Sequence, residues 1–353
     1  MTAQRPAVLV GIDTEADDQW SARGREENSV SNARCLPAVQ ALFESFGIRP
    51  TYVATYEMAT RPESRGVLRD LADSRRAEIG THLHPWSSPP FRPEDKAAHT
   101  YPHNLPLELL ERQLGELTAV IEENVGVRPT SYRAGRNGFD GRTLPILERL
   151  GYTVDTSVDP LFNERRKGGM LFAGAPLVPY RPDYADVRKP GDSKILEIPI
   201  SAATLPALPK ALEAAYARLK PIPYRGALKR LGLRAVWLRP SYSSLSDMRT
   251  FASRLKEDGV PCFNIIFHSS ELLPGGSPYT PDAASVARFL DDLKRLLEHL
   301  VGLGGVGMTY REFASAFTEG RIGSERRASE IDSRERAGAP GGAPQRPPTQ
   351  SRP

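Results

Sequence analysis

Short apolar runs alternate with amphipathic stretches over most of the chain. Apolar runs of this length, bounded by turn residues, are typical of buried strands. Strands are predicted at residues 8–13, 51–55, 78–84, 131–135, 153–158, 196–201, 236–240, 262–268 and 305–309. Apolar residues at helical spacing predict helices at residues 107–124, 142–150, 247–256 and 283–299. Thr280, followed by Pro281, predicts the start of the last helix. Eight or nine strands alternating with helices predict an α/β protein with a parallel sheet.

A closed or nearly closed βα barrel is the simplest architecture for this order of elements. A doubly wound open sheet is the alternative. However, residues 14–20 form an acidic turn after the first strand, where that fold needs a glycine-rich phosphate loop. The alternation weakens between about residues 160 and 236, where Pro and Gly are frequent. We interpret residues 1–319 as one barrel domain, in which this stretch is an insertion over the barrel mouth.

Composition places the chain among ordinary globular proteins, since 39% of its 353 residues are hydrophobic and 25% are charged. The net charge of +4 comes mostly from residues 320–353, which contain seven Arg and four acidic residues and so carry +3. This segment is rich in Pro and Gly and nearly free of apolar side chains, which predicts a disordered tail. The remaining +1 gives no reason to expect nucleic acid as a partner.

No apolar run approaches membrane-spanning length, so no membrane partner is expected. The apolar run at residues 7–12 is too short for the core of a signal peptide followed by a cleavage site. Cys35 and Cys262 do not suggest a disulfide framework. A cytoplasmic location is therefore expected.

Two histidines two positions apart, His82 and His84, are the most informative chemical feature. They stand at the end of a predicted strand, in the run of residues 78–86. Residues i and i+2 of a strand share one face, so the two imidazoles can form half of a divalent-metal site. The structural alternative is a pair of hydrogen-bonded histidines where the strand ends.

Further polar residues follow the other predicted strands. Asp13 and Glu15 come after the first strand. Arg133 lies in the fourth strand with Arg136 after it, and His268 ends a late strand. Because active residues of βα barrels gather at the C-terminal ends of the strands, we expect these side chains on one face. Taken singly, each has a structural alternative, such as a helix cap, a salt bridge or a core histidine.

These residue types suit metal-dependent hydrolysis. One carboxylate and two histidines leave a tetrahedral ion with an open position for water, as catalytic zinc requires. A second carboxylate beside that water can act as general base, and a histidine on the far side can act as general acid. Such a set hydrolyses an ester or an amide. Ser269 and Ser270 lack the flanking glycines of a nucleophile elbow.

The runs at residues 11–15, 78–86, 132–136 and 267–272 resemble, in this order, the motifs of the polysaccharide deacetylases with a NodB-homology domain, which are similar to carbohydrate esterase family four. The resemblance covers roughly residues 7–315 and is closest to the branch with a His-x-His-Pro-Trp second motif. It implies a distorted (β/α)7-like barrel and metal-dependent removal of an acyl group, usually acetyl, from an N-acylated sugar. The implied substrate is a carbohydrate or a small-molecule amide. The implied cofactor is one divalent ion, Zn²⁺ or alternatively Co²⁺.

The resemblance also implies roles for single residues. Asp13 resembles the catalytic base, and Glu15 stands near the usual metal-ligand aspartate. His82 matches the first metal histidine. Arg133 corresponds to the arginine that orients the base, and His268 to the general acid.

The motifs depart from the family pattern in two places. Asp13 and Glu15 are separated by one residue, whereas the family has adjacent acids, so the division of base and ligand between them stays open. The two histidines are two apart rather than four, so His84 is a ligand by geometry alone. The candidates for unassigned positions are His99 and His103 as metal ligands and Asp155 and Glu197 as the residue that tunes His268.

Two other functions stay open on the sequence alone. A decayed deacetylase site would leave a non-catalytic barrel that binds glycans or a protein partner, and metal content separates this from catalysis. A binuclear amidohydrolase also uses a His-x-His pair, but on its first strand and with a bridging lysine.

The candidates for aromatic platforms under a sugar ring are Trp20, Trp86, Tyr279 and Phe91.

Overall fold

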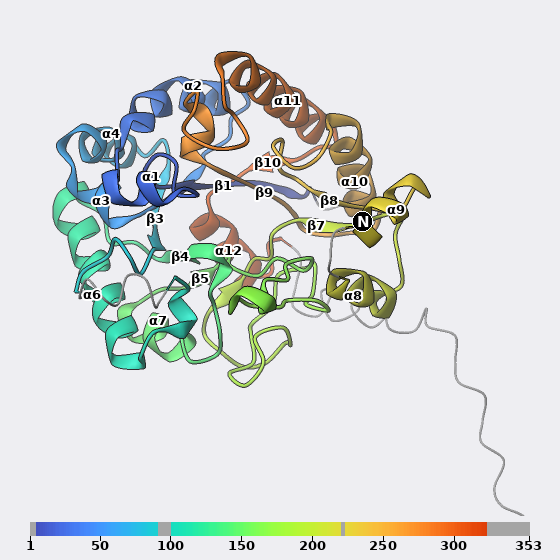
Figure 1. Ribbon diagram of the computed structural model, residues 1–353, viewed down its shortest axis with the longest axis horizontal. Helices are drawn as coiled ribbons and strands as arrows, with labels where there is room; N and C mark the ends of the chain where they lie inside the picture. Colours follow the sequence, from blue (N-terminus) through green and yellow to red (C-terminus); the bar gives the residue numbers. More distant parts are fainter. Residues whose placement is uncertain (1–4, 91–99, 220–222, 323–353) are drawn as a thin grey trace, which may run out of the picture.

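The computed structural model describes residues 5–90, 100–219 and 223–322. Its central strands are β1 (Ala7–Thr14), β2 (Thr51–Ala54), β3 (Glu78–Leu83), β4 (Ser131–Ala134), β5 (Val154–Asp155), β6 (Leu196–Glu197), β9 (Cys262–His268) and β10 (Val306–Gly307). β1 has β9 on one side and β2 on the other, and β3 to β6 follow β2 in chain order. β10 pairs with the start of β1, and all these pairs are parallel. The strands β1 to β6 and β9 form a curved half-barrel, which confirms the predicted distorted (β/α)7-like fold (Figure 1).

Asn264 makes hydrogen bonds with both its side chain and its backbone across the gap between the outer strands β6 and β9. The amide nitrogen Nδ2 of Asn264, in β9, donates to the carbonyl oxygens of Ile198 and Pro199, both at 3.0 Å. The backbone N–H of Ser201 donates to the carbonyl of Asn264 at 3.2 Å. An asparagine inside a strand is unusual, and here its side chain replaces the missing ladder between the two strands.

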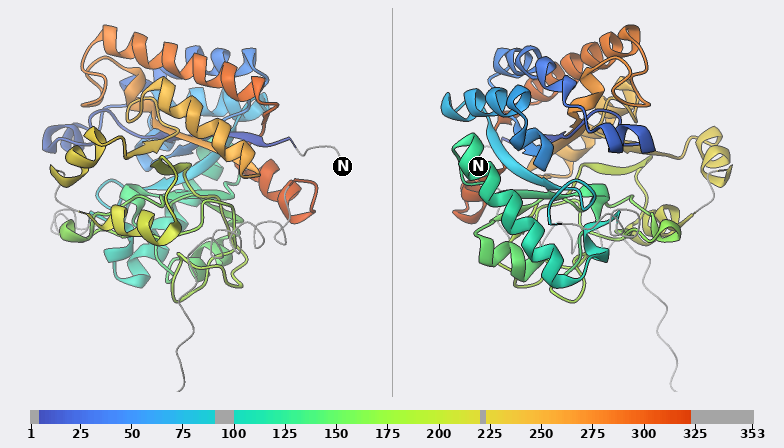
Figure 2. Two further views of the ribbon diagram at one scale, coloured as in Figure 1. Left: turned by 90° about the vertical axis from the view of Figure 1, so that its right-hand side faces the viewer. Right: turned by 60° about the vertical axis from the view of Figure 1, so that its left-hand side comes forward.

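Helices cover the outer side of the sheet (Figures 1 and 2). The longer ones are α2 (Leu36–Ser45), α4 (Pro62–Asp73), α6 (Leu107–Val125), α10 (Leu245–Glu257), α11 (Ala283–Gly302) and α12 (Tyr310–Thr318), and the shorter ones are α1 (Ala22–Glu27), α3 (Tyr56–Thr60) and α7 (Leu144–Leu150). The four predicted helices all exist, but α11 starts at Asp282 and not at Thr280. The Asp282 carboxylate accepts from the backbone N–H of Ser285 and so caps the helix.

The predicted insertion contains β7 (Ala202–Leu205), α8 (Lys210–Arg218) and α9 (Pro223–Arg230) and leads into β8 (Arg234–Trp237). β7 and β8 pair with each other in antiparallel fashion, apart from the main sheet. The assignment of residues 236–240 to a barrel strand is therefore wrong. β7 was not predicted, since its four residues begin with two alanines, which have a low strand propensity.

The predicted domain limits stay predictions. Most of the predicted tail, residues 323–353, lies outside the described residues. Ile322, just before it, packs against a buried apolar cluster that includes Phe313 and Phe317 of α12. No helix in the described part of the chain has the length and apolar character needed to cross a membrane.

Candidate metal centre

The predicted site residues converge because they lie at, or directly after, the C-terminal ends of parallel strands. β1 and β9 pair in register, so that Asp13 lies opposite His268. β3 and β4 place His82 opposite Arg133 in the same way. Glu15 comes directly after β1, where its backbone N–H donates to Ser269 Oγ at 3.2 Å. The arrangement is the one expected for the active face of a βα barrel.

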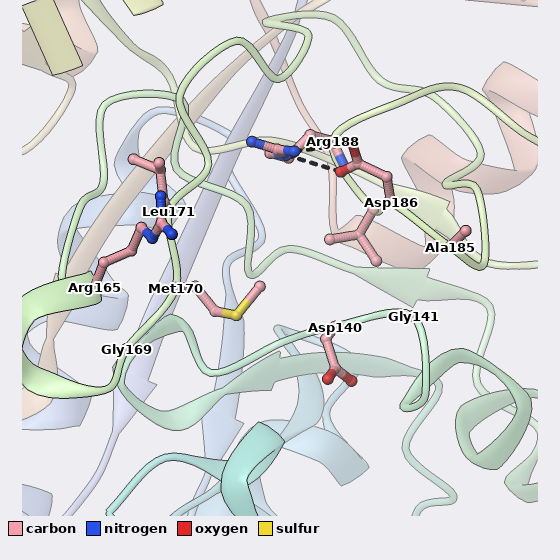
Figure 3. Close-up of a pocket in the computed structure, with 10 residues that line it drawn as sticks. Asp140, Gly141, Arg165, Gly169, Met170, Leu171, Ala185, Asp186 and Arg188 are labelled. Atoms are coloured by element: carbon pink, nitrogen blue, oxygen red, sulfur yellow. Dashed lines mark hydrogen bonds and ion pairs between the residues drawn. The ribbon is translucent and has the colours of Figure 1, made fainter. Parts of the chain in front are cut away.

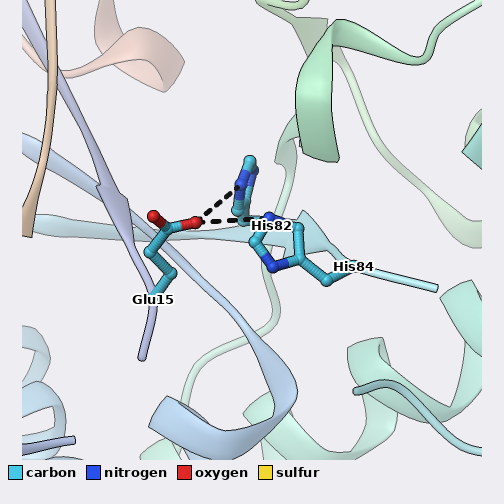
Figure 4. Close-up of side chains that lie close together, drawn as sticks. All are labelled: Glu15, His82 and His84. Atoms are coloured by element: carbon cyan, nitrogen blue, oxygen red, sulfur yellow. Dashed lines mark ion pairs between the residues drawn. The ribbon is translucent and has the colours of Figure 1, made fainter. Parts of the chain in front are cut away.

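Glu15, His82 and His84 form a compact, buried group whose potential ligand atoms all lie within 4.8 Å of one another (Figure 4). Glu15 Oε2 is 3.3 Å from His84 Nε2 and 3.8 Å from His82 Nε2. The other ring nitrogen of His82, Nδ1, donates to the backbone carbonyl of Arg133 at 3.0 Å. This hydrogen bond fixes the ring so that Nε2 faces the group, as is usual for metal-binding histidines. One carboxylate and two imidazoles are thus in place to hold a divalent ion.

Burial sets the protonation of this group. Burial, opposed in part by Asp13, lowers the pKa of His82 to about 4. Burial also lowers the pKa of His84 well below its usual value, and the nearby His82 adds to the effect. Both rings are therefore neutral near neutral pH, which is the form that binds metals. Burial, then repulsion from Asp13, raises the pKa of Glu15 well above its usual range. A cation at this carboxylate would therefore compete with protons to a higher pH than it would at an ordinary glutamate.

Asp13 stands beside this group as an ionised carboxylate. Arg133 Nη1 donates to Asp13 Oδ1 at 2.6 Å, and both side chains are buried. Burial opposes ionisation, but the Arg133 charge, followed by His82 and His268, lowers the pKa of Asp13 to about 2. The pKa values of Asp13 and Glu15, although the two residues are only two positions apart, are therefore shifted in opposite directions by their surroundings.

Arg133 is itself held by a buried network that the sequence did not predict. Its Nη2 donates to Tyr310 Oη at 2.7 Å and its Nε donates to the carbonyl of Thr156 at 3.0 Å. Tyr310 in turn donates to Asn264 Oδ1 at 2.8 Å. Gly11 makes room for this network, because a Cβ atom there would lie 2.0 Å from Tyr310 Oη.

His268 faces the group from β9. Its Nε2 is 3.6 Å from Asp13 Oδ2 and 4.0 Å from Glu15 Oε1. Its Nδ1 donates to Glu271 Oε1 at 2.9 Å. Arg239 Nη2 donates to the same oxygen at 2.6 Å. Burial opposes ionisation of Glu271, but Arg239 and then His268 lower the pKa of Glu271 to about 2. The fully buried Glu271 carboxylate therefore contacts Nδ1 of His268, the ring nitrogen that faces away from the ligand group.

Glu271 corrects the assignment of Asp155 or Glu197 as the partner of His268. Asp155 and Glu197 instead form a buried acid pair in which burial, followed for Glu197 by the charge of its neighbour, raises both pKa values. The sequence feature that could have identified Glu271 is its spacing of three residues from His268. His268 precedes the 3-10 turn η5 (Ser269–Leu272), and Glu271 is its third residue, the capping-box position.

The remaining sequence candidates are not members of the ligand group. Arg136 stacks on Tyr101, with its guanidinium carbon 4.0 Å from the ring centre, and donates to Thr100. His103 is buried beside Tyr101 and does not belong to the three-residue ligand group. Trp86 is buried and stacks on His84, with ring centres 4.2 Å apart. His99 and Phe91 lie outside the described residues.

A separate hollow of about 440 Å³ lies between the β4–α7 loop and the insertion (Figure 3). Asp140, Arg165, Met170 and Arg188 are among its lining residues. Arg188 Nε pairs there with Asp186 Oδ1 at 2.8 Å. None of the lining residues belongs to the Glu15, His82 and His84 group, so this hollow is distinct from the candidate metal centre.

Comparison with known proteins identifies the class of fold. No family model matches the chain, and no curated protein matches it in sequence. Among solved structures, the fold matches a candidate polysaccharide deacetylase from Mycobacterium smegmatis, with a TM-score of 0.52 and 12% identity over 100% of this chain and 96% of the other. It also matches a candidate glycoside hydrolase or deacetylase from Parabacteroides distasonis, with a TM-score of 0.56 and 15% identity over 89% and 72% of the two chains.

The chain thus has the fold of the polysaccharide deacetylases, in agreement with the motif resemblance. At identities of 12% and 15% the likeness concerns the fold alone.

Proposed function

We propose that this protein is a metal-dependent hydrolase that removes an acyl group, typically acetyl, from an N-acylated sugar or a related amide. The observation that supports the proposal is the placement of two hydrogen-bonded pairs of side chains around one ligand group. Asp13 with Arg133 and His268 with Glu271 flank the Glu15, His82 and His84 group. Hydrolysis of an amide needs these three parts together, namely a metal, a base and an acid.

The three ligand side chains fit a divalent ion well. They supply one carboxylate and two neutral imidazoles, a set typical of catalytic zinc, and three protein ligands would leave a coordination position open for water. A divalent ion held there would supply Lewis acidity for the acyl carbonyl and would make the attacking water more acidic. We propose Zn²⁺ as the physiological ion, with Co²⁺ as the alternative.

Asp13 serves as the general base in this proposal. Its carboxylate is ionised and its Oδ1 is held by Arg133, so Oδ2 can accept the proton of the attacking water. Arg133 keeps Asp13 oriented while the negative charge moves from the carboxylate to the substrate oxygen. The network through Tyr310 and Asn264 holds the guanidinium in place.

His268 serves as the general acid, from the strand next to that of the base. The Glu271 carboxylate accepts from Nδ1, so Nε2 is the atom that can deliver a proton to the departing amine nitrogen. Arg239 balances the charge of Glu271 and keeps that carboxylate ionised. The base and the acid thus approach the reacting carbon from two neighbouring strands, β1 and β9.

The proposal is tested by assaying a panel of N-acetyl sugars and small amides with metal-free protein and with added Zn²⁺ or Co²⁺. We expect turnover that depends on the metal and is lost in Asp13→Asn, while that variant keeps its metal. An amide in place of the carboxylate cannot accept the proton of water. A protein that binds one ion yet hydrolyses nothing in the panel would instead be a glycan- or partner-binding barrel.

A further inference from the structure

Four arginines lie within electrostatic reach of the candidate metal centre, and two of them have no acidic partner in the described part of the chain. All four influence pKa values of the ligand group, and they are Arg133, Arg239, Arg25 and Arg136. Arg133 pairs with Asp13 and Arg239 pairs with Glu271, each at 2.6 Å, so these two charges are balanced. Within residues 5–90, 100–219 and 223–322, Arg25 and Arg136 form no ion pair. Two positive charges beside one site attract an anion to it.

Arg25 is held next to the ligand group through Trp86. Its guanidinium carbon lies 5.3 Å from the centre of the Trp86 ring, which stacks on His84. Its Nε donates to the backbone carbonyl of Gln19 at 2.8 Å, and the Gln19 side chain accepts from Trp86 Nε1 at 2.9 Å. Gln19 therefore fixes both the arginine and the ring. The two Nη groups of Arg25 make no hydrogen bond to the described residues, so their N–H groups can donate to a ligand.

Arg136 approaches His84 from the turn after β4. A Cβ atom at Gly135 would lie 2.4 Å from His84 Cδ2, so this turn passes directly against the imidazole ring. Arg136 has a φ of 53°, a left-handed conformation that is uncommon for residues with a side chain and is concentrated at functional sites. Its Nη1 and Nη2 donate to Thr100 Oγ1 and Tyr101 Oη, both at 2.7 Å. These bonds orient the guanidinium and leave Nε–H and one N–H of each Nη for a ligand.

The charges of Arg25 and Arg136 act on each other as well as on His84. Burial, followed by the Arg136 charge, lowers the pKa of Arg25. Burial is the largest cause that lowers the pKa of His84, and both arginines add to it. Asp18 opposes the effect on Arg25, but its carboxylate accepts from Ser21 Oγ and forms no ion pair with the guanidinium. Like charges held close together repel each other, and a bound anion would remove this repulsion.

We propose that Arg25 and Arg136 bind an anionic group of the substrate, a carboxylate or a phosphate, so that the preferred substrate is an N-acylated sugar that carries negative charge. This assignment rests on the proposed function. A guanidinium presents a planar fork of N–H donors that matches the oxygens of either anion. Both side chains are half-buried, so they are open to a substrate that enters from solvent.

The experiment measures, by calorimetry with the metal-loaded protein, the binding of glucosamine and of three anionic relatives. These are glucosamine 1-phosphate, glucosamine 6-phosphate and 2-amino-2-deoxyglucuronate. None of the four has an acyl group, so none is hydrolysed during the titration. We expect at least one anionic compound to bind at least about tenfold more tightly than glucosamine, because charge-assisted hydrogen bonds are strong. An advantage of a phosphate supports a phosphate-linked substrate, and an advantage of the uronate supports a sugar acid.

Substitution of the two arginines separates their contribution from that of the metal ion. Arg25→Gln and Arg136→Gln should each reduce the advantage of the anionic compound at least about fivefold and leave glucosamine binding unchanged. Arg136→Lys keeps the charge without the planar fork and should keep part of the advantage.

Arg149→Gln is the matched control and should bind all four compounds like the wild type. Its side chain is 54% exposed and pairs with Glu111 on the outer helices, so the variant loses the same charge away from the site. Metal content and melting temperature of every variant show that losses of affinity arise neither from lost metal nor from unfolding.

The assignment is overturned if no anionic compound binds more tightly than glucosamine, or if the advantage persists in both Gln variants, as it would for an anion bound by the metal alone. Equal losses of kcat/KM on neutral and anionic N-acetyl sugars in Arg25→Gln and Arg136→Gln would show that the arginines act on the reacting oxygen, which also overturns it. Because binding requires no turnover, an arginine-dependent preference for anions in a protein that hydrolyses no amide refutes only the proposed function. Turnover of neutral N-acetyl sugars without any preference for anions refutes only the role of the two arginines.

Discussion

At the scale of single residues, the site separates similar side chains into different states through their neighbours. Arg133 lies against Asp13 and lowers the pKa of that carboxyl, whereas two neutral imidazoles and another acid surround Glu15, whose pKa is raised. The surroundings of the three histidines differ as well. His82 and His84 are buried and neutral, and His268 has an ionised carboxylate behind it. The roles follow from this environment, since the residue types alone would permit several assignments.

Removal of a ligand should lower metal content. We expect His82→Ala and His84→Ala each to lose bound metal by at least roughly tenfold, since two remaining protein ligands chelate an ion poorly. Mass spectrometry or elemental analysis of the purified variants measures this. His103→Ala is the control, because His103 is buried but outside the ligand group. Full metal content in His84→Ala would show that the ligand set is different.

Metal binding should release a proton from Glu15 at pH values above those at which an ordinary glutamate would release one. Glu15 has a raised pKa and must ionise to bind a cation, whereas His82, with a pKa of about 4, is already neutral. As pH falls, protons compete with the ion, so affinity should drop by about tenfold per pH unit below the Glu15 pKa. Calorimetry in buffers of different ionisation enthalpy counts the protons. Glu15→Gln should release none, and equal release in that variant would assign the proton elsewhere.

His268 should matter for turnover and not for metal binding. We expect His268→Ala to reduce kcat by roughly 10²–10⁴-fold, the usual contribution of general acid–base catalysis, with unchanged metal content. Rate, metal content and melting temperature are measured on the same preparation. A folded, metal-loaded variant with nearly normal kcat would remove His268 from the mechanism, and a large fall in melting temperature would indicate a structural histidine.

At the scale of elements, the secondary structure that the sequence predicted best was the set of buried strands. The apolar runs around Asp13 and His268 predicted β1 and β9, because both strands are covered on both faces. β7 and β8 were missed as a pair, since four-residue strands leave too little pattern to read. Arg239 and Tyr310 could not be assigned for another reason. Each reaches the site from a distant part of the chain, and only their contacts reveal a role.

Because β1 lies against the buried Arg133 and Tyr310 side chains, substitutions of two glycines by alanine should change the stability of the protein in opposite directions. Gly11→Ala should destabilise the protein by about 1–3 kcal/mol or more, because the new Cβ would clash with the buried Tyr310 and Arg133 side chains. Gly115→Ala, in α6 with no atom within 4 Å of the added Cβ, should stabilise it by about 0.5–1 kcal/mol. Urea unfolding compares the two. If both substitutions changed the free energy of unfolding equally, the Arg133 and Tyr310 side chains would be able to move aside for an added methyl group.

At the scale of the whole molecule, both ends of the described chain contribute to one core. β1 pairs with β9 and β10, and α12 packs Phe313 and Phe317 against the same cluster as Leu9. Tyr310, the first residue of α12, completes the network under Asp13. The barrel could be predicted from the order of strands and helices. The packing of α12 and β10 against β1 could not, because it depends on which strand edges and helices of distant parts of the chain come together in space.

Truncation after Ile322 should leave the protein intact. Residues 323–353 contain few apolar side chains that could pack. We therefore expect full metal content and a melting temperature within about 2 °C of the full chain. Truncation before α12 is the contrasting control and should unfold the protein, since it removes Tyr310, Phe313 and Phe317. A loss of several degrees after Ile322 would mean that the removed segment docks on the barrel.

The pairing of β1 with β9 also has a consequence for synthesis of the protein. The backbone of Glu15 is held by Ser269, 254 positions later in the chain. A ribosome that adds about 5–20 residues per second needs roughly 13–50 s to cover that distance. During this time β1 exposes an apolar edge that is open to wrong partners. Products of premature termination before Ser269 therefore cannot complete the centre.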